Sequence, residues 1–294
     1  MYPEKPADPN YLKGLLTNVT RLRNAFKPNI EGRTLADYAF SSGNAQGGAV
    51  IYQRQLKDTT VPIEGRDAEE VAYGAAFPII DFGEDEELLA KVKQRGAEIE
   101  MTDAAIRRNE TSTWLEKKAK LEATVRRKID DISLATIVND PDINVFTPAV
   151  EWDDPDAEKI GDIYSGVSLI NDTNNDYGYV ADSVLVHPLD ALQFFLRDKS
   201  IREQFPRESR DLNPVLSGDM AGIAGLNWIK NNRVKRGELY IFQSKIIGSL
   251  RDEMGGMQVN PYRKEDRHVQ AVQVWYENVP VITNPLAITK VQFN

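Results

Sequence analysis

Apolar residues recur at helical spacing in three segments of the chain. The stretch 8–27 begins at Asp8, an N-cap candidate, and ends at Lys27 and Pro28; its apolar face comprises Leu12, Leu15, Leu16, Val19, Leu22 and Phe26. Asp154 and Pro155 open another predicted helix, whose buried face comprises Ile160, Ile163, Tyr164, Val167 and Ile170. Between them lies the strongest helical pattern of the chain, at about 113–138.

That central pattern predicts one long helix. Thr113 and Glu116 match a capping box, and the apolar stripe comprises Trp114, Leu121, Val125, Ile129, Ile132 and Thr136. At 1.5 Å per residue, about 25 residues give a helix of roughly 37 Å. A helix of this length is expected to act as a structural beam rather than as a local turn.

Residues 39–80 alternate between glycine-rich and β-prone sequence. The segment "SSGNAQGG" precedes β-prone runs at 49–56 and 59–63, and "EEVAYGAAFPII" returns as an extended segment. This pattern predicts a long β-hairpin with charged residues near its tip. Two strands alone are only marginally stable, so the hairpin needs a surface to lie on.

Further strand patterns surround the long helix and follow it. Gln94–Met101 predicts a polar strand before a short helix capped by Thr102, and Val180–Val186 predicts a buried strand before a helix opened by Pro188. The segments "GLNWIKNNR" and "GELYIFQSKIIGSL" predict a hairpin that turns at 235–237. Residues 145–262 are therefore expected to form one α+β domain.

The closing stretch, "AVQVWYENVPVITNPLAITKVQFN" (271–294), keeps strand character almost to its end. Pro280 and Pro285 divide it, and Val291 and Phe293 share one face. Terminal residues are ordered only when other parts of the chain hold them. We therefore expect this stretch to pair with the strand around 92–101, beside the long helix.

The composition is that of a globular chain without disulfides. The 294 residues are 41% hydrophobic and 28% charged and include no cysteine, which excludes thiolate catalysis and Cys-based metal sites. The net charge of −9 argues against a protein that is basic overall and coats nucleic acid. No signal peptide and no stretch of 18 apolar residues is found, so we expect a cytosol-like compartment and no membrane.

One segment opposes the overall charge. Residues 10–33 contain Lys13, Arg21, Arg23, Lys27 and Arg33 against a single acid. The simplest interpretation is a solvated helix face. The alternatives are docking on an acidic partner surface and facing nucleic acid.

Residues suited to catalysis or metal binding are few. His187 is interpreted as a capping or otherwise satisfied polar group, and His268 as part of a solvated charge run. The segment "NDTNNDYGY" offers Asp172, Asn174 and Asp176, but it lacks the EF-hand spacing and is interpreted as an Asx-rich loop. We therefore expect no catalytic residue, no cofactor-binding residue and no metal site.

The order of these parts resembles that of the major capsid proteins of tailed bacteriophages, the Hong Kong 97-type fold. The resemblance is carried by "AEIEMTDAAIRRNETSTWLEKKAKLEATVRRKIDDISLATI" (98–137), "ADSVLVHPLDALQFF" (181–195) and "HVQAVQVWYENVPVITNPLAITKVQ" (268–292). It implies an α+β fold with an N-terminal arm at 1–38, an extended hairpin (E-loop) at 39–80 and an inserted A-domain at 146–262. The P-domain then comprises 81–145, with a spine helix at about 113–138, and the closing strands at 263–294.

The resemblance implies a structural protein rather than an enzyme. Such a subunit self-assembles as pentamers and hexamers into an icosahedral shell around packaged double-stranded DNA, in the virion, after assembly in the host cytoplasm. A separate scaffolding protein, a portal and a decoration protein are expected partners. Two alternatives remain: an encapsulin-like nanocompartment shell, and an enzyme with a carboxylate site at Asp153, Asp154 and Asp156.

Some members of the family lock their shell with an isopeptide bond between an E-loop lysine and a P-domain asparagine, assisted by a carboxylate. The residues that the resemblance offers for this cross-link are Lys57, Asn260 and Glu265, although their spacing does not clearly match the family's pattern. The alternative is that Lys57 is an ordinary surface lysine.

Overall fold

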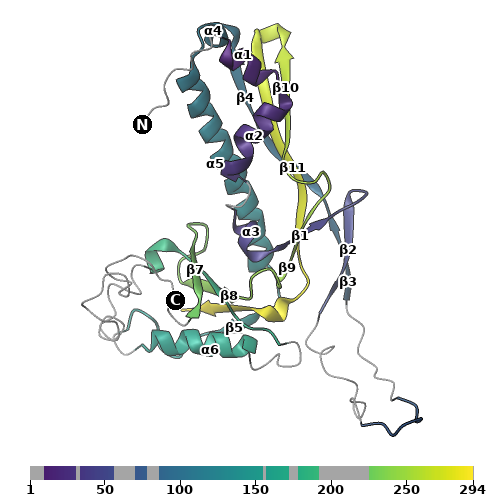
Figure 1. Cartoon of the computed structure of the whole chain (residues 1–294). Helices are drawn as coiled ribbons and strands as arrows, with labels where there is room; N and C mark the ends of the chain where they lie inside the picture. Colours follow the sequence, from purple (N-terminus) through teal and green to yellow (C-terminus); the bar gives the residue numbers. More distant parts are fainter. Residues whose placement is uncertain are drawn as a thin grey trace. The chain divides into compact units, whose positions relative to one another are not determined.

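The computed structural model describes residues 10–30, 34–55, 70–77, 86–154, 157–171, 178–191 and 225–293. The chain forms two compact units, each assembled from three separate stretches. The first unit is Met1–Val50, Leu89–Ala135 and Leu250–Val281, and the second is Ile51–Leu88, Thr136–Ser249 and Ile282–Asn294. Each unit combines helices with a sheet, which makes the fold α+β (Figure 1).

Most of the helices that the structure describes belong to the first unit. Its helices are α1 (Tyr11–Leu16), α2 (Val19–Ile30), α3 (Leu35–Ala39), α4 (Asp103–Arg107) and nearly all of α5 (Thr111–Val138). Its strands are β1 (Ser41–Asn44), β4 (Lys93–Thr102), β9 (Gly248–Asp252), β10 (Gln258–Lys264) and β11 (Val269–Ile282), the last two joined by a 3-10 turn at Glu265–Arg267.

Strand β11 organises the sheet of the first unit. It pairs antiparallel with β4, from Val269↔Thr102 to Asn278↔Lys93, and with β10, from Val269↔Lys264 to Trp275↔Gln258. The predicted pairing of the closing stretch with residues around 92–101 is thus confirmed for its first part. Figure 1 shows α5 running along this sheet.

The N-terminal helix differs from its prediction. Instead of one helix over 8–27 there are two, because Asn18 interrupts the helix and its side-chain oxygen accepts the Arg21 N–H at 3.0 Å. Pro28 does not end α2, which continues to Ile30, a side chain with no exposed surface. Burial of Ile30 offsets the one hydrogen bond that proline removes. Asp8, the expected cap, lies outside the described residues.

The hairpin closes later in the sequence than predicted. Strand β2 (Ala49–Arg54) forms a two-stranded sheet with β3 (Glu86–Lys91), whereas residues 70–77 contain no strand. Within the second unit, the buried Arg54 forms ion pairs with Asp140 and, at 2.6 Å, with Asp142. The predicted run at 59–63 lies outside the described residues.

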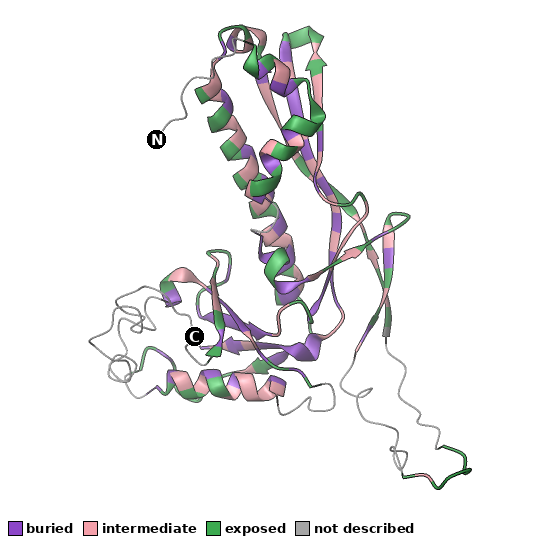
Figure 2. Ribbon diagram, in the orientation of Figure 1, coloured by how far each residue is buried: buried purple, intermediate pink, exposed green. Residues whose placement is uncertain are grey.

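The second unit is built on another sheet, in the order β5–β12–β8–β6–β7. Its elements are β5 (Asn144–Phe146), α6 (Lys159–Asn171), β6 (Ser183–Val186), β7 (Asn227–Lys230), β8 (Glu238–Phe242), a 3-10 turn at Pro285–Ala287 and β12 (Ile288–Gln292). The predicted hairpin of β7 and β8 is wrong, because the fully buried β6 lies between them and pairs with both. Figure 2 shows how buried the strands of this sheet are.

The end of the chain also departs from its prediction. Strand β12 does not extend the sheet of β4 but pairs with β5 and β8 in the second unit. The shared face of Val291 and Phe293 is buried as expected, and Phe293 stacks on Trp152 with ring centroids 4.1 Å apart. The closing stretch is therefore ordered by two different sheets.

Helix α6 lies against the sheet of the second unit with a face that includes a glycine. Ile163 and Ile170 are fully buried as predicted, whereas Tyr164 is 54% exposed. Gly166 is buried instead, and a Cβ atom there would stand 2.8 Å from Ile241 Cδ1 and 3.0 Å from Val291 Cγ2. Tyr164 lies two residues before Gly166 and therefore on the opposite side of the helix, away from the sheet.

Candidate functional site

The long helix α5 presents a buried stripe to the rest of the first unit. Trp114, Leu121, Val125 and Ile129 are at most 8% exposed, as predicted, and Trp114 meets the ring of Phe26 edge-on with centroids 6.0 Å apart. Ile132, predicted in the same stripe, is only half-buried. The buried positions continue instead at Ser133, Leu134 and Ile137.

The start of α5 is also corrected. The helix begins at Thr111, so Thr113 lies inside its first turn and is not its cap. The Thr113 hydroxyl donates to a carboxylate oxygen of Glu110 at 3.4 Å. The predicted capping box of Thr113 and Glu116 therefore does not form.

Polar contacts fix the N-terminal helices on α5. Glu122 accepts two hydrogen bonds from the Asn29 amide, at 3.2 and 3.3 Å, and pairs with Lys118 at 3.2 Å. Asp130 accepts the first free N–H of α3, that of Leu35, at 2.6 Å. The helical part of the arm is thus packed on the core of its own unit.

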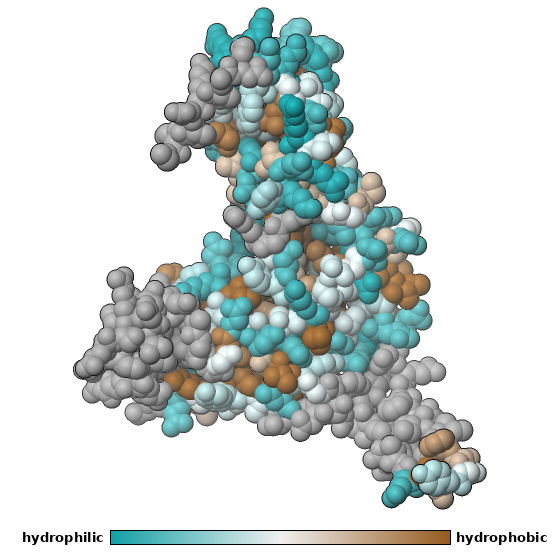
Figure 3. Space-filling view, in the orientation of Figure 1, coloured by the Kyte–Doolittle hydropathy of each residue, from teal (hydrophilic) through white to brown (hydrophobic). Residues whose placement is uncertain are grey.

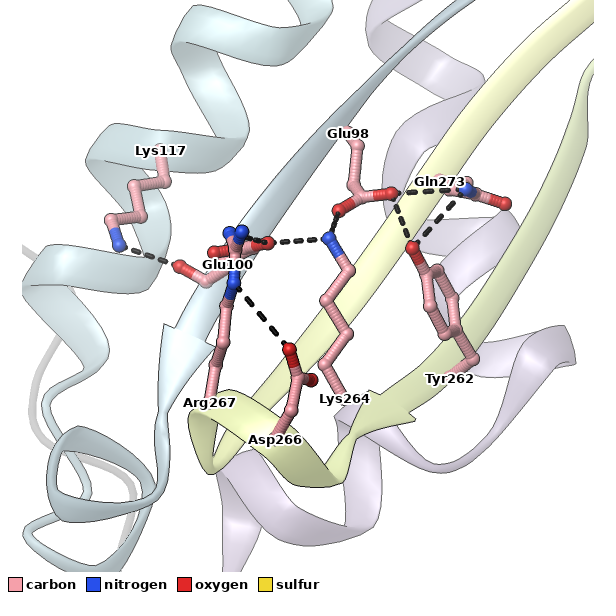
Figure 4. A network of polar contacts seen from close by, with 8 residues as sticks. All are labelled: Glu98, Glu100, Lys117, Tyr262, Lys264, Asp266, Arg267 and Gln273. Carbon is pink, nitrogen blue, oxygen red and sulfur yellow. Dashed lines mark hydrogen bonds and ion pairs between the residues drawn. The ribbon is translucent and has the colours of Figure 1, made fainter.

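A polar network crosses the outer face of the first sheet near its end (Figure 4). Lys264 on β10 pairs with Glu98 on β4 and, at 2.5 Å, with Glu100. Glu98 also accepts the Tyr262 hydroxyl at 2.6 Å and the Gln273 amide at 2.9 Å. The side chains reach over β11, where the residue opposite both Glu100 and Tyr262 is the small Ala271.

These contacts shift the protonation of the groups involved. Hydrogen bonds from Lys264, foremost, and from Tyr262 lower the pKa of Glu98 to about 2. The two glutamates in turn raise the pKa of Lys264, with the hydrogen bond to Glu100 the larger cause. Glu98 and Lys264 are therefore both charged near neutral pH, and the contacts of Glu98 tie three strands together.

Sequence reasoning did not single out this network. The signal was nevertheless present, because Glu98 and Glu100 on β4, like Tyr262 and Lys264 on β10, are two residues apart and so share a face. What the sequence lacked was the register that brings these pairs to opposite sides of one residue of β11.

The cross-link candidates are placed only in part. Asn260 is exposed on β10, and Glu265 is exposed in the turn after it and forms an ion pair with Arg263 at 2.7 Å. Lys57 lies outside the described residues. The cross-link stays a prediction.

The carboxylate and histidine candidates do not form a site among the described residues. Asp153 and Asp154 are exposed, and Asp156 and the Asx-rich segment 172–177 (with Asp172, Asn174 and Asp176) lie outside the described ranges. His187 Nδ1 accepts the Leu189 N–H at 3.2 Å, as expected of a capping group. His268 is exposed.

No cluster of three or more side chains that could hold a metal ion is found in the described part of the chain. None of the helices described is long and apolar enough to cross a membrane.

Comparisons with known proteins identify the family. A family model for phage capsid protein matches residues 85–291, well over half of the chain. The chain therefore belongs to the phage capsid protein family. A search of curated protein sequences found no match.

Solved structures share the fold at low sequence identity. A virus-like particle from Pyrococcus furiosus aligns with a TM-score of 0.61 and 11% identity, covering 93% of this chain and 99% of that one. The mature capsid of bacteriophage PhiM1 aligns with a TM-score of 0.57 and 13% identity, covering 86% of this chain and 84% of that one. A structure from Microbacterium phage Oxtober96 aligns with a TM-score of 0.56 and 13% identity, covering 86% of this chain and 89% of that one.

The fold is thus that of the Hong Kong 97-type capsid proteins, and membership of the phage capsid protein family makes the chain a structural component of the virion.

Proposed function

We propose that this subunit assembles as pentamers and hexamers into an icosahedral shell that encloses double-stranded DNA. The observation that carries the proposal is the family match over 85–291, which spans the long helix and, apart from β1, the strands of both five-stranded sheets. Closed rings and shells arise when one chain makes repeated heterologous contacts. Assembly in the host cytoplasm with a separate scaffolding protein, a portal and a decoration protein belongs to the same proposal.

The domain plan of the family supplies the parts of such a subunit. In this proposal the arm is 1–38, the E-loop 39–80, the A-domain 146–262, and the P-domain 81–145 with 263–294. The late position of β3 and the place of β12 in the second sheet argue for an E-loop that extends to about 91 and an A-domain that includes 282–294.

Electron microscopy of the purified full chain tests the assembly. Under assembly-permitting conditions we expect closed particles with five- and six-fold capsomers in negative stain. A stable monomer of 33.1 kDa as the only species would contradict the proposal.

Boiling the particles in detergent tests the Lys57–Asn260 cross-link. If the cross-link forms, a gel should show a ladder of covalently joined subunits, and the ladder should vanish with Lys57→Arg.

A second candidate keeps the fold and changes the content of the shell. The similarity to the Pyrococcus furiosus virus-like particle, which extends over 99% of that chain, favours an encapsulin-like compartment. The content of particles isolated from the native source separates the two functions. Long double-stranded DNA supports the phage shell, and a single enclosed protein supports the compartment.

A further inference from the structure

One end of the first unit contains a pocket whose lining is predominantly basic. It lies between α1, α4 and the turn that joins β10 to β11, and has a volume of about 740 Å³. Its charged lining residues are Lys13, Arg107, Arg263, Arg267 and a single carboxylate, Asp103. Ligand sites commonly have volumes of this order. The excess of cations is notable in a chain of net charge −9.

One cation of the pocket is already neutralised. Arg263 holds Asp103 through two parallel hydrogen bonds, at 2.9 and 2.8 Å, and pairs with Glu265 at 2.7 Å. The Asp103 N–H also donates to the His268 carbonyl at 3.1 Å. These contacts fix the wall of the pocket and do not provide free charge for a ligand.

The arginines and the lysine that remain in the pocket are less committed than Arg263. Within the described residues, neither Lys13 nor Arg107 forms an ion pair with a carboxylate. Arg267 forms two long ion pairs, with Asp266 at 3.8 Å and with Glu100 at 3.9 Å, both beyond hydrogen-bond distance. Lys13, Arg107 and Arg267 line the pocket from three separate segments of the chain.

The basic character continues from the pocket along the N-terminal helices. Arg21 lies over α1, since its Nη1 would stand 3.6 Å from a Cβ atom at Gly14, one residue from Lys13. Arg21 and Lys27 are exposed on α2. In Figure 3, hydrophilic residues dominate the surface at this end of the first unit.

We propose that the pocket binds backbone phosphates of the enclosed double-stranded DNA. Guanidinium and ammonium groups are the usual ligands of phosphate oxygens. A DNA backbone is an extended row of phosphates and matches a pocket continued by a row of cations better than a short acidic peptide does. The inference rests on the proposed function, because only the content of the shell brings DNA to this surface.

Salt-dependent DNA binding by the purified full chain tests the pocket. Anisotropy of a labelled 20-base-pair duplex is measured from about 50 to 300 mM salt, with each neutralised phosphate expected to contribute about 0.9 to the slope of log K against log salt. Replacing Lys13→Gln, Arg107→Gln and Arg267→Gln together should reduce that slope by about 2 to 3 and weaken binding about tenfold or more.

The matched control removes three exposed lysines elsewhere, with Lys120→Gln, Lys235→Gln and Lys245→Gln, and should retain most of the slope. Thermal unfolding must show both triple variants folded. If the pocket variant keeps the wild-type slope, the inference is overturned. It is also overturned if the variant loses binding to polyglutamate while binding DNA normally, which would assign the pocket to an acidic protein partner.

Particle formation separates this inference from the proposed function. Wild-type chain that forms no particles refutes the shell assembly, whatever its affinity for DNA. If the pocket variant forms particles that hold as much DNA, equally resistant to release by salt, the shell stands and the phosphate site is rejected. If the pocket variant forms particles from which salt releases DNA more readily than from wild-type particles, the phosphate site is supported.

Discussion

Glu98 shows how a surface carboxylate becomes structural through its neighbours. It accepts hydrogen bonds from Lys264, Tyr262 and Gln273, which come from two other strands. Its side chain is only 25% exposed, so solvent screens these contacts less than it does those of a free surface pair. The pKa of Glu98, lowered to about 2, records how strongly they favour the charged form.

The first prediction concerns acid. Because the folded-state pKa of Glu98 lies below its ordinary value of 4.5, its contribution to stability is complete above about pH 4.5 and is lost as pH falls toward 2. Chemical denaturation should find Glu98→Gln less stable than wild type by on the order of 1 kcal/mol at pH 7. This difference in the free energy of unfolding between wild type and Glu98→Gln should become smaller below pH 4.5.

Glu116→Gln is the matched control, since Glu116 pairs with Lys120 on the exposed side of α5 and should show no comparable effect. If Glu98→Gln is less stable than wild type by the same amount at pH 3 and at pH 7, the stabilising role of the ionised Glu98 is contradicted.

The second prediction uses the two glycines of α6. Gly166→Ala places a Cβ atom against Ile241 and Val291 and should cost about 1 to 3 kcal/mol through overpacking. Gly161→Ala on the same helix meets nothing closer than 3.5 Å and should stabilise by up to about 1 kcal/mol. Thermal unfolding of both variants compares them directly, and stabilisation by both would refute the close approach.

At the scale of the element, α5 was the most predictable part of the fold. Its length and four of the five proposed core residues followed from the 3.6-residue period alone. The prediction that Ile132 is buried was wrong, because Ser133, four residues after Ile129, is the residue that faces the core. Periodicity indicates which face of a helix is buried. It cannot specify where packing against a neighbouring element moves the buried stripe by one residue.

The third prediction tests the stripe. Val125→Asp buries an uncompensated carboxylate at a position only 4% exposed and should cost about 3 kcal/mol or more. Thr124→Asp introduces the same residue at the adjacent, exposed position and should be nearly neutral. Unfolding and particle yield are measured for both, and normal yields with Val125→Asp would remove α5 from the core.

At the scale of the whole molecule, strands remote in sequence complete each sheet. Strand β12, at the end of the chain, lies between β5 and β8 in the second unit, while β11, a few residues earlier, belongs to the sheet of the first. Both units therefore require residues from late in the sequence. We expect neither sheet to be complete until this region of the chain is available.

The fourth prediction concerns β12. Val291 has no exposed surface, so Val291→Asp should disrupt the second sheet at a cost of about 3 kcal/mol or more, whereas Gln292→Asp on the half-buried face should cost much less. Hydrogen exchange should show protection lost in β5 and β8 but retained in β4 and β10. Loss confined to β4 and β10 would place the strand in the other sheet.

The sequence by itself determined the α+β class, the long helix, the strand before it and the order of parts that resembles a phage capsid protein. These features depend on local periodicity and on residues near one another in the chain. Tertiary structure alone decided that β6 separates β7 from β8, that β3 closes the hairpin, and that the last strand leaves the sheet of β11. Strand partners are chosen by non-local packing, because many pairings satisfy the same alternation of side chains and only burial of all faces at once selects one.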